Sequence, residues 1–328
     1  AIAADREVIS AAPEHTQTLE ALEALFAAGT KQLEIGEIFK PLDRAAGDWD
    51  KLAQVYEAQL VHTPAEKVGD ALGGQEDRLA AYYRIAELHE EKLVDAAGSL
   101  EVYLRALKEY PLDERSGEEV ARLASVVDGG WDTLANAYAD IVGVHENPEV
   151  QRTIGKKLAH VFEDELGDIT KAEETYKYVL SVEPLDVDAL SNLDRIYLSL
   201  ESWPDLAQIL EQRIKAGGEA IDLIEFHVRL GEIYETRKAD TDNAIRVFRR
   251  IFDELDRTND AAIAALGRIY AALGNWPELL TVNERELENA SGDAAEADIR
   301  AKIGHLLAEQ LGQHERAIET WKAVLDLR

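Results

Sequence analysis

Three arginines recur at one position of a repeating pattern, and their chemistry is that of carboxylate binding. Arg122, Arg195 and Arg268 follow one another at equal intervals of about 73 residues. A guanidinium group is a planar fork of N–H donors that matches the geometry of a carboxylate. The row could therefore bind acidic side chains, or the terminal carboxylate, of a partner protein.

Acidic and histidine side chains hold the related positions between these arginines. The equivalent position in the alternating units holds Glu87, His160, Glu232 and His305. Three residues further along lie Glu90, Glu163 and Glu235. In one interpretation both rows line a peptide-binding groove, in which the acids would bind lysine or arginine side chains of a partner. In the other, each arginine pairs with a glutamate on the next helix and holds the repeats in register. The two can coexist, and the second is favoured.

Signatures of catalysis, metal binding and cofactor binding are missing from the sequence. There are no cysteines, which excludes disulfides, thiol nucleophiles and cysteine metal ligands. None of the eight histidines forms an H-E-x-x-H motif, and no P-loop, G-x-G-x-x-G or G-x-S-x-G motif is present. We therefore expect no catalytic residues, no metal site and no cofactor, and we predict that the chain is not an enzyme.

The charge balance limits the classes of partner. The chain has 65 acidic and 35 basic residues, for a net charge of −30 at pH 7. Such a chain is repelled by nucleic acids and anionic lipids, so we expect neither as a partner. A solvated acidic surface is favoured over attraction of a basic partner. We recognise no signal-peptide pattern and no membrane-spanning run in these residues, so we leave the compartment open, with the cytoplasm slightly favoured.

The elements that carry these residues are helices that repeat along the chain. One aromatic series recurs with this same period of about 73 residues, at Tyr103, Tyr176, Phe248 and Trp321. A second series has the same period except for a longer first interval, at Trp49, Trp131, Trp203 and Trp276. The intervening segments place apolar residues at i, i+3, i+4 and i+7, which is typical of helices. Each period thus holds four helices, arranged as two hairpins of alternating kind.

The hairpin pattern resembles that of the tetratricopeptide repeat family. Its first helix carries a large apolar residue, a small residue and an aromatic residue, as in Leu230, Gly231 and Tyr234. Its second helix carries a small residue and then an aromatic one four positions later, as in Ala244 and Phe248. The Trp-bearing units depart from this pattern. Leu206, three residues after Trp203, replaces the small residue of the second helix, and Asp194 replaces the small residue of the first helix.

The resemblance implies an all-α solenoid, a right-handed superhelix of about eight helical hairpins whose first helices line a concave groove. The family's best-known peptide site uses Lys and Asn on successive first helices to clamp a terminal carboxylate. Lys156 alone stands at a suitable position and the matching Asn residues are missing, so we do not expect that clamp.

The repeat also suggests where the chain divides. We expect residues 1–47 to form a partial repeat plus an extra helix at residues 30–46. Residues 48–328 would form the array, with double repeats near 49–130, 131–202 and 203–275 and a partial one at 276–328. A second insertion near residues 61–77 is Gly-rich and charged, and we expect a flexible loop there.

The function that the sequence favours is that of a non-catalytic scaffold binding a protein segment in the concave groove. The candidate groove residues are Arg122, Arg195, Arg268, Lys156, His160, Glu232 and His305. Two alternatives stay open. The out-of-phase ends could stack end to end and self-assemble, which exposure of Val8, Ile9, Val324 and Leu325 would favour. The chain could also be a docking or regulatory region of a larger enzyme.

Overall fold

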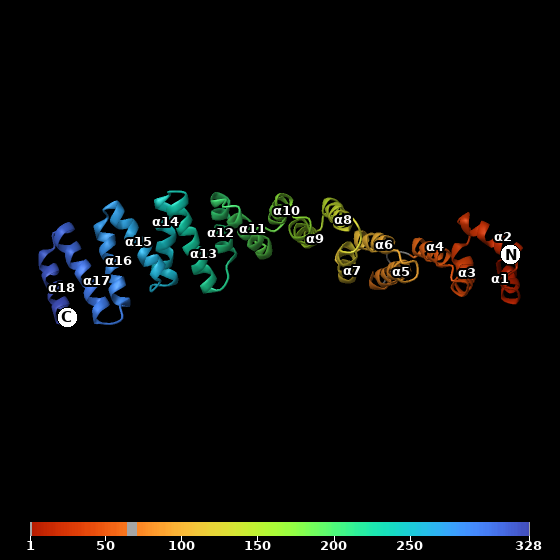
Figure 1. Cartoon of the computed structure of the whole chain (residues 1–328), viewed down its shortest axis with the longest axis horizontal. Helices are drawn as coiled ribbons and strands as arrows, with labels where there is room; N and C mark the ends of the chain where they lie inside the picture. Colours follow the sequence, from red (N-terminus) through yellow and green to blue (C-terminus); the bar gives the residue numbers. More distant parts are fainter. Residues whose placement is uncertain (1, 64–70, 328) are drawn as a thin grey trace. The chain divides into compact units, whose positions relative to one another are not determined.

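The computed structural model describes residues 2–63 and 71–327, and every regular element in these ranges is a helix (Figure 1). None of these helices is long and apolar enough to cross a membrane. The first ten helices are α1 (Ile2–Ala11), α2 (Thr16–Ala27), α3 (Gln32–Ala46), α4 (Trp49–His62), α5 (Ala71–Glu91), α6 (Ala96–Glu109), α7 (Glu114–Ala124), α8 (Gly130–Val144), α9 (Pro148–His160) and α10 (Ile169–Val182). The others are α11 (Val187–Ser199), α12 (Trp203–Ala216), α13 (Ala220–Glu232), α14 (Thr241–Arg250), α15 (Asp260–Leu273), α16 (Trp276–Asn289), α17 (Asp293–His305) and α18 (His314–Leu327).

Short π-helical turns extend four of the helices. They are η1 (Val161–Glu165) after α9, η2 (Ile233–Arg237) after α13, η3 (Ile251–Leu255) after α14 and η4 (Leu306–Gln310) after α17. Three of the four therefore follow the first helix of a hairpin of the same kind.

The chain forms two compact units, Ala1–Thr175 and Tyr176–Arg328, with α10 crossing the division. In the first unit α3 packs on α4, α5 on α6 and α7 on α8. In the second, α11 packs on α12, α13 on α14, α15 on α16 and α17 on α18. Together with the consecutive helices α9 and α10, these pairs confirm the expected all-α array of about eight hairpins. The right-handed superhelix stays a prediction.

Helix starts recur with the same period as the aromatic residues. Asp95, Asp168 and Asp240 each accept a hydrogen bond from the backbone N–H three residues later, at 2.9, 3.0 and 3.2 Å. A second series does the same before the Trp-bearing units, at Asp113, Asp186 and Asn259. A capping side chain satisfies an N–H that has no partner in the helix and contributes about 1 kcal/mol. The caps thus fix where each of these helices starts.

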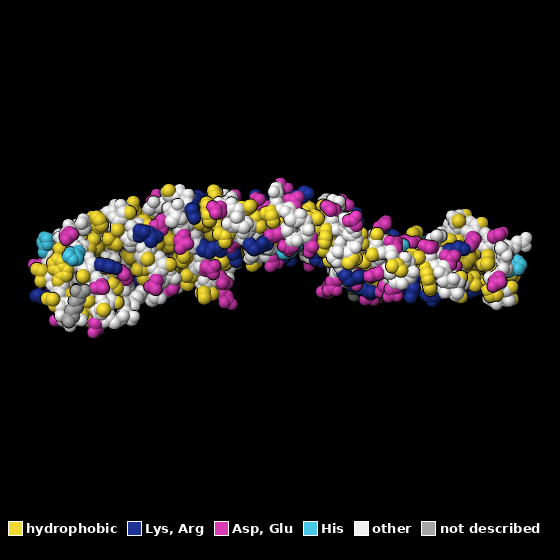
Figure 2. Space-filling view, viewed as in Figure 1, with side chains coloured by type: hydrophobic (Ala, Val, Ile, Leu, Met, Phe, Trp, Pro, Cys, Tyr) yellow, Lys and Arg dark blue, Asp and Glu magenta, His cyan; other side chains and the backbone are white. Residues whose placement is uncertain are grey.

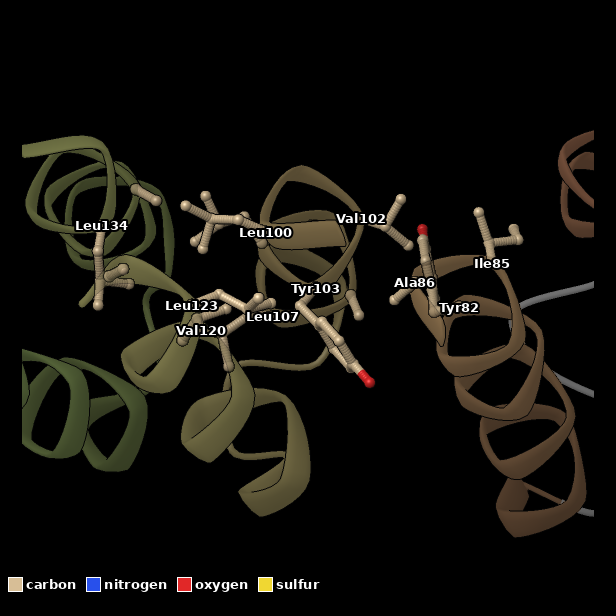
Figure 3. Packing of buried hydrophobic residues seen from close by; sticks show 14 of the residues in the cluster. Tyr82, Ile85, Ala86, Leu100, Val102, Tyr103, Leu107, Val120, Leu123 and Leu134 are labelled. Carbon is tan, nitrogen blue, oxygen red and sulfur yellow. The ribbon is translucent and has the colours of Figure 1, made fainter. Parts of the chain in front are cut away.

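The core runs between neighbouring hairpins. In the first unit one continuous cluster extends from α4 to α9, and Figure 3 shows its part around α5, α6 and α7. There Tyr82 of α5, Tyr103 of α6 and Val120 of α7 are at most 5% exposed. A smaller cluster joins α1, α2, α3 and α4 around Leu22 and Ile35. Each hairpin buries its apolar face against the next one, as repeat arrays require.

The Trp residues that start the second helices are half-buried, and two of them face a cation. Lys92 Nζ lies 5.9 Å from the ring centre of Trp49, and the guanidinium of Arg237 lies 4.5 Å from that of Trp203. A cation above an indole face is a favourable contact.

The N-terminal hairpin differs from the sequence expectation. Residues 30–46 contain α3, which packs on α4 as the first helix of an ordinary hairpin rather than as an extra helix. The additional helix is α2, which contacts both α1 and α3. The expected boundary between residues 47 and 48 therefore falls inside a hairpin.

The expected loop at residues 61–77 also differs in part. Val61 and His62 end α4, and residues 71–77 belong to α5. The remainder of that expectation, residues 64–70, lies outside the described residues.

The two helices of a hairpin approach each other most closely at a glycine. A Cβ built on Gly231 of α13 would lie 2.6 Å from ring atom Cζ of Phe248. A Cβ on Gly304 of α17 would likewise collide with the indole of Trp321. By contrast, the nearest atom to a Cβ on Gly267 of α15 is Val282 Cγ1, at 3.9 Å. Of these three glycines, only the first two are therefore required by packing.

We predict that Gly231→Ala lowers the free energy of unfolding by about 1–3 kcal/mol, because the Phe248 ring and its helix must move apart. Gly267→Ala is the matched control. It should be neutral or stabilising by up to about 1 kcal/mol, because alanine favours a helix over glycine and meets no clash. Urea denaturation followed by circular dichroism measures both. Equal losses in the two variants would contradict the close-approach argument.

Candidate functional site

Two of the three predicted arginines pair with glutamates on the preceding first helix. Arg122 of α7 binds both carboxylate oxygens of Glu90 of α5, at 2.8 and 2.6 Å. Arg268 of α15 binds both oxygens of Glu235 of η2, at 2.8 and 2.7 Å. The hydrogen bonds from Arg122 hold the pKa of Glu90 below its usual range. For these two arginines the geometry is that of the register-holding ladder.

The other predicted groove residues are spread over both units. Arg195 of α11 donates to Asn192 Oδ1 at 3.2 Å, and Glu232 at the end of α13 is exposed. His160 lies 3.4 Å from Asp164 in the next turn, and Lys156 lies on α9 in the same unit. His305 of α17 lies 3.6 Å from Glu309 and meets the Trp321 ring edge-on.

One cavity brings two of the predicted residues together. It has a volume of about 760 Å³ and lies between α15, α16, α17 and η4 in the second unit. Arg268 and His305 stand on its wall, with Lys302 and Glu286. Its apolar lining comes from Ile263, Leu279, Val282 and Leu306. The combination of an apolar surface and a few polar groups is typical of ligand sites.

The corresponding place one period earlier is filled instead of open. Asp194 of α11 is 4% exposed and forms ion pairs with Arg213 of α12 and Arg229 of α13. Arg229 holds both of its oxygens, at 3.0 and 2.5 Å. The guanidinium of Arg213 also lies 4.0 Å from the ring centre of Phe226. The triad explains why the expected small residue is missing at position 194, since the carboxylate joins three helices there.

The three positions that correspond to this triad one period later hold much less side chain. They are Gly267, Glu286 and Lys302, of which the last two pair at 3.4 Å. Because Gly267 has no side chain and only one pair replaces the triad, the space between the helices stays open. Gly267 keeps the small residue that the repeat pattern expects, and the open space is found in the unit that lacks the Asp194 triad.

A change of residue type between the units places an amide in this cavity. Seven residues after each Trp of the repeat stand Tyr56, Tyr138 and Leu210, all buried, and then Asn283. Asn283 is half-buried and lines the cavity. Within the described ranges its carboxamide has no hydrogen-bond partner. The sequence analysis missed this residue, although comparison of the four units position by position could have found it.

The described residues contain no group of three or more His, Asp or Glu side chains that could hold a metal ion. On the visible face in Figure 2, acidic and basic side chains are interspersed.

We predict that Asp194→Asn lowers the free energy of unfolding by about 2–4 kcal/mol, because it leaves two largely buried guanidinium groups without their counter-charge. Glu235→Gln removes the partner of Arg268 at the surface and should cost less than about 1 kcal/mol. Urea titrations of both variants at pH 7 test the difference. A loss in Glu235→Gln as large as that in Asp194→Asn would contradict it.

A comparison with protein-family models agrees with this architecture. A family model described as a tetratricopeptide repeat matches residues 262–295, which contain most of α15, all of α16 and the start of α17. The search of curated proteins found no match.

Several solved structures are similar to the chain. The structure of MamA is 21% identical, with 49% of this chain and 90% of that one covered and a TM-score of 0.33. YrrB, described as a tetratricopeptide repeat protein with an unusual peptide-binding site, is 20% identical, with 59% and 93% covered and a TM-score of 0.34. A tetratricopeptide repeat protein from Parabacteroides merdae is 17% identical, with 76% and 98% covered and a TM-score of 0.32. Likenesses of this size carry no argument about function.

The matched unit, the recurring helix pairs and the glycine–aromatic contacts within them lead to one conclusion. Residues 262–295 match a tetratricopeptide repeat, and the helical array around them is consistent with a protein built of such repeats.

Proposed function

We propose that the chain is a non-catalytic protein-interaction scaffold, and that its second unit binds a protein segment in the concave groove, at the cavity between α15 and α17. Stacked helical repeats of this kind offer extended surfaces for protein partners. The observation that carries the proposal is the opening at Gly267 and Asn283, where the preceding period is filled by Asp194 and Leu210.

The lining favours an apolar anchor on the bound segment. Ile263, Val282 and Leu306 surround space that neighbouring side chains leave empty. Filling such space with an aliphatic or aromatic side chain removes apolar surface from water at about 25 cal/mol per Å². The segment therefore gains affinity from one side chain inserted beside Gly267.

The amide of Asn283 favours recognition of the backbone beside that anchor. A carboxamide has one acceptor oxygen and two N–H donors, which match the N–H and C=O groups of an extended peptide. Arg268 and Lys302 at the wall remain available to a carboxylate of the segment only in competition with Glu235 and Glu286. Apolar and backbone contacts thus outweigh charge in this proposal.

The test starts with a random twelve-residue peptide library displayed on phage and panned against the chain. The tightest peptide is then measured by fluorescence anisotropy. We predict that Asn283→Leu, which restores the residue type of Leu210, weakens binding by about 5–100-fold, because the backbone loses its amide partner. Gly267→Leu should weaken it further by filling the cavity.

The control is Gly267→Ala, which adds one methyl group with room to spare and should change affinity by less than about threefold. Panning that yields no peptide above background, or full binding by Asn283→Leu, would contradict the proposal.

End-to-end association is a second candidate, because apolar side chains are exposed on the terminal helices. Ile318 and Leu325 of α18 are 50% and 76% exposed, and Val8 of α1 is 39% exposed. Ile9 and Val324 are buried, so only two of the four residues expected at the ends are available.

Sedimentation velocity over a wide concentration range tests this second candidate. A concentration-independent monomer is the expected result for a groove-binding scaffold. Growth into larger species that Leu325→Glu abolishes would favour assembly instead.

A further inference from the structure

A second cavity, with a volume of about 1290 Å³, lies in the first unit and has a different chemistry. It is lined by α2, α3 and α4, with contributions from α5 and the residues after it. The aromatic rings of Phe26 and Phe39 meet edge to face on its wall, with their centres 5.9 Å apart. Leu19 and Val55 complete an apolar surface. The inserted helix α2 therefore helps to build a wall that the other hairpins lack.

Acidic side chains dominate the polar part of this lining. Lys51 is the cavity's one lysine among the described residues, and it already binds Glu23 at 2.9 Å and lies 3.6 Å from Asp48. Glu57 is held by both nitrogens of the Arg105 fork. Three further acids of the described lining have no salt-bridge partner, namely Glu14, Asp43 and Asp50. The cavity thus carries negative charge that the described part of the chain does not neutralise.

Asp43 is the exceptional member of this group. It is 8% exposed, and its Oδ2 atom is shielded from solvent with no hydrogen-bond partner in the described structure. It stands six residues before Trp49, where the units of Trp203 and Trp276 carry Tyr197 and Tyr270. Those two rings are 3% and 4% exposed. A carboxyl group therefore occupies a position that those two units give to a buried aromatic ring.

The charged neighbours of Asp43 oppose its ionisation. Burial, with Asp48 and Glu23 nearby, raises its pKa to about 6, while Lys51 acts in the opposite direction. From α5, His89 also lines the cavity and lies 3.0 Å from Asp95. An unpaired carboxylate in such surroundings is costly, and a cation placed beside it would remove that cost.

We propose that this cavity binds an arginine side chain of a partner protein, with the guanidinium at Asp43 and the carbon stem along the apolar wall. The guanidinium group supplies N–H donors and a counter-charge for the carboxylate, and its flat face fits the rings of Phe26 and Phe39. The stem of an arginine buries apolar surface while its head stays with the charge. The described residues offer no cluster that could hold a metal ion instead. This site shares no residue with the cavity between α15 and α17.

The test uses two peptide pools that are identical and degenerate except at their central residue. That residue is arginine in one pool and citrulline, its neutral isostere, in the other. Both are captured by the whole chain at pH 7, and the best arginine peptide is measured by fluorescence anisotropy. We expect at least tenfold tighter binding of that peptide than of its citrulline form, and at least tenfold weaker binding by Asp43→Asn.

The pH dependence provides a readout that needs no variant. The cation binds the ionised form of Asp43, so affinity should fall about tenfold between pH 7 and pH 5, through the pKa of about 6. The acids at the rim serve as the control. Asp50→Asn removes an exposed acid and should change affinity less than about threefold.

Three results would overturn the inference: equal binding of the citrulline peptide, unchanged binding by Asp43→Asn, or affinity that is constant from pH 7 to pH 5. Asp43→Asn is expected to fold, because it removes a carboxylate that burial disfavours, and circular dichroism checks this. Gly267→Leu should leave the arginine peptide bound, which separates failure of this site from failure of the site in the second unit.

Discussion

One contact sets the geometry of two hairpins of the second unit, α13–α14 and α17–α18, namely the approach of a glycine to an aromatic ring on the following helix. At Gly231 and Phe248, and again at Gly304 and Trp321, the ring occupies the space where a Cβ would stand. This brings the helix axes together and fixes the position of one helix along the axis of the other. The other positions of these two hairpins are placed by that register, including the capping residue Asp240 and the cavity residues Lys302 and His305.

In a closely packed repeat, a difference in side-chain size or polarity between two units leaves unfilled space between the helices. In a close-packed interior, neighbours cannot collapse into space that a missing side chain leaves, because their own contacts hold them in place. Gly267 stands where Asp194 ties three helices together, and Asp43 stands where Tyr197 and Tyr270 fill the core. Both cavities adjoin such a position. In this chain, both candidate binding sites adjoin a position where one unit holds a smaller or more polar side chain than another unit does.

The sequence predicted the helices, their period and their pairing, because apolar periodicity and aromatic spacing are local features. It could not identify the additional helix. The stretch from Pro13 to Trp49 is longer than that from Pro184 to Trp203, which shows an insertion but not which segment was inserted. The structure identifies α2 as the additional helix, because α3 packs on α4 as the first helix of a hairpin.

The candidate sites were predicted less completely than the helices. Spacing identified Arg122 and Arg268 as candidates, and only side-chain conformation shows that Glu90 and Glu235 already bind them. Asn283 and Asp43 were visible in principle as exceptions to the repeat, but the volume beside them depends on three neighbouring helices.

The half-buried Trp residues at the starts of the second helices give the chain intrinsic fluorescent probes in several of its repeats. Trp49 and Trp203 lie under Lys92 and Arg237, and the corresponding positions for Trp131 and Trp276 hold Glu165 and Gln310. The emission energy of an indole responds to the electric field across its ring, so a positive, a negative and a neutral neighbour give it different spectra. Each Trp also reports the packing of the hairpin to which it belongs. The intrinsic fluorescence therefore encodes position along the array, and the order in which its components change on heating would trace how melting spreads from repeat to repeat.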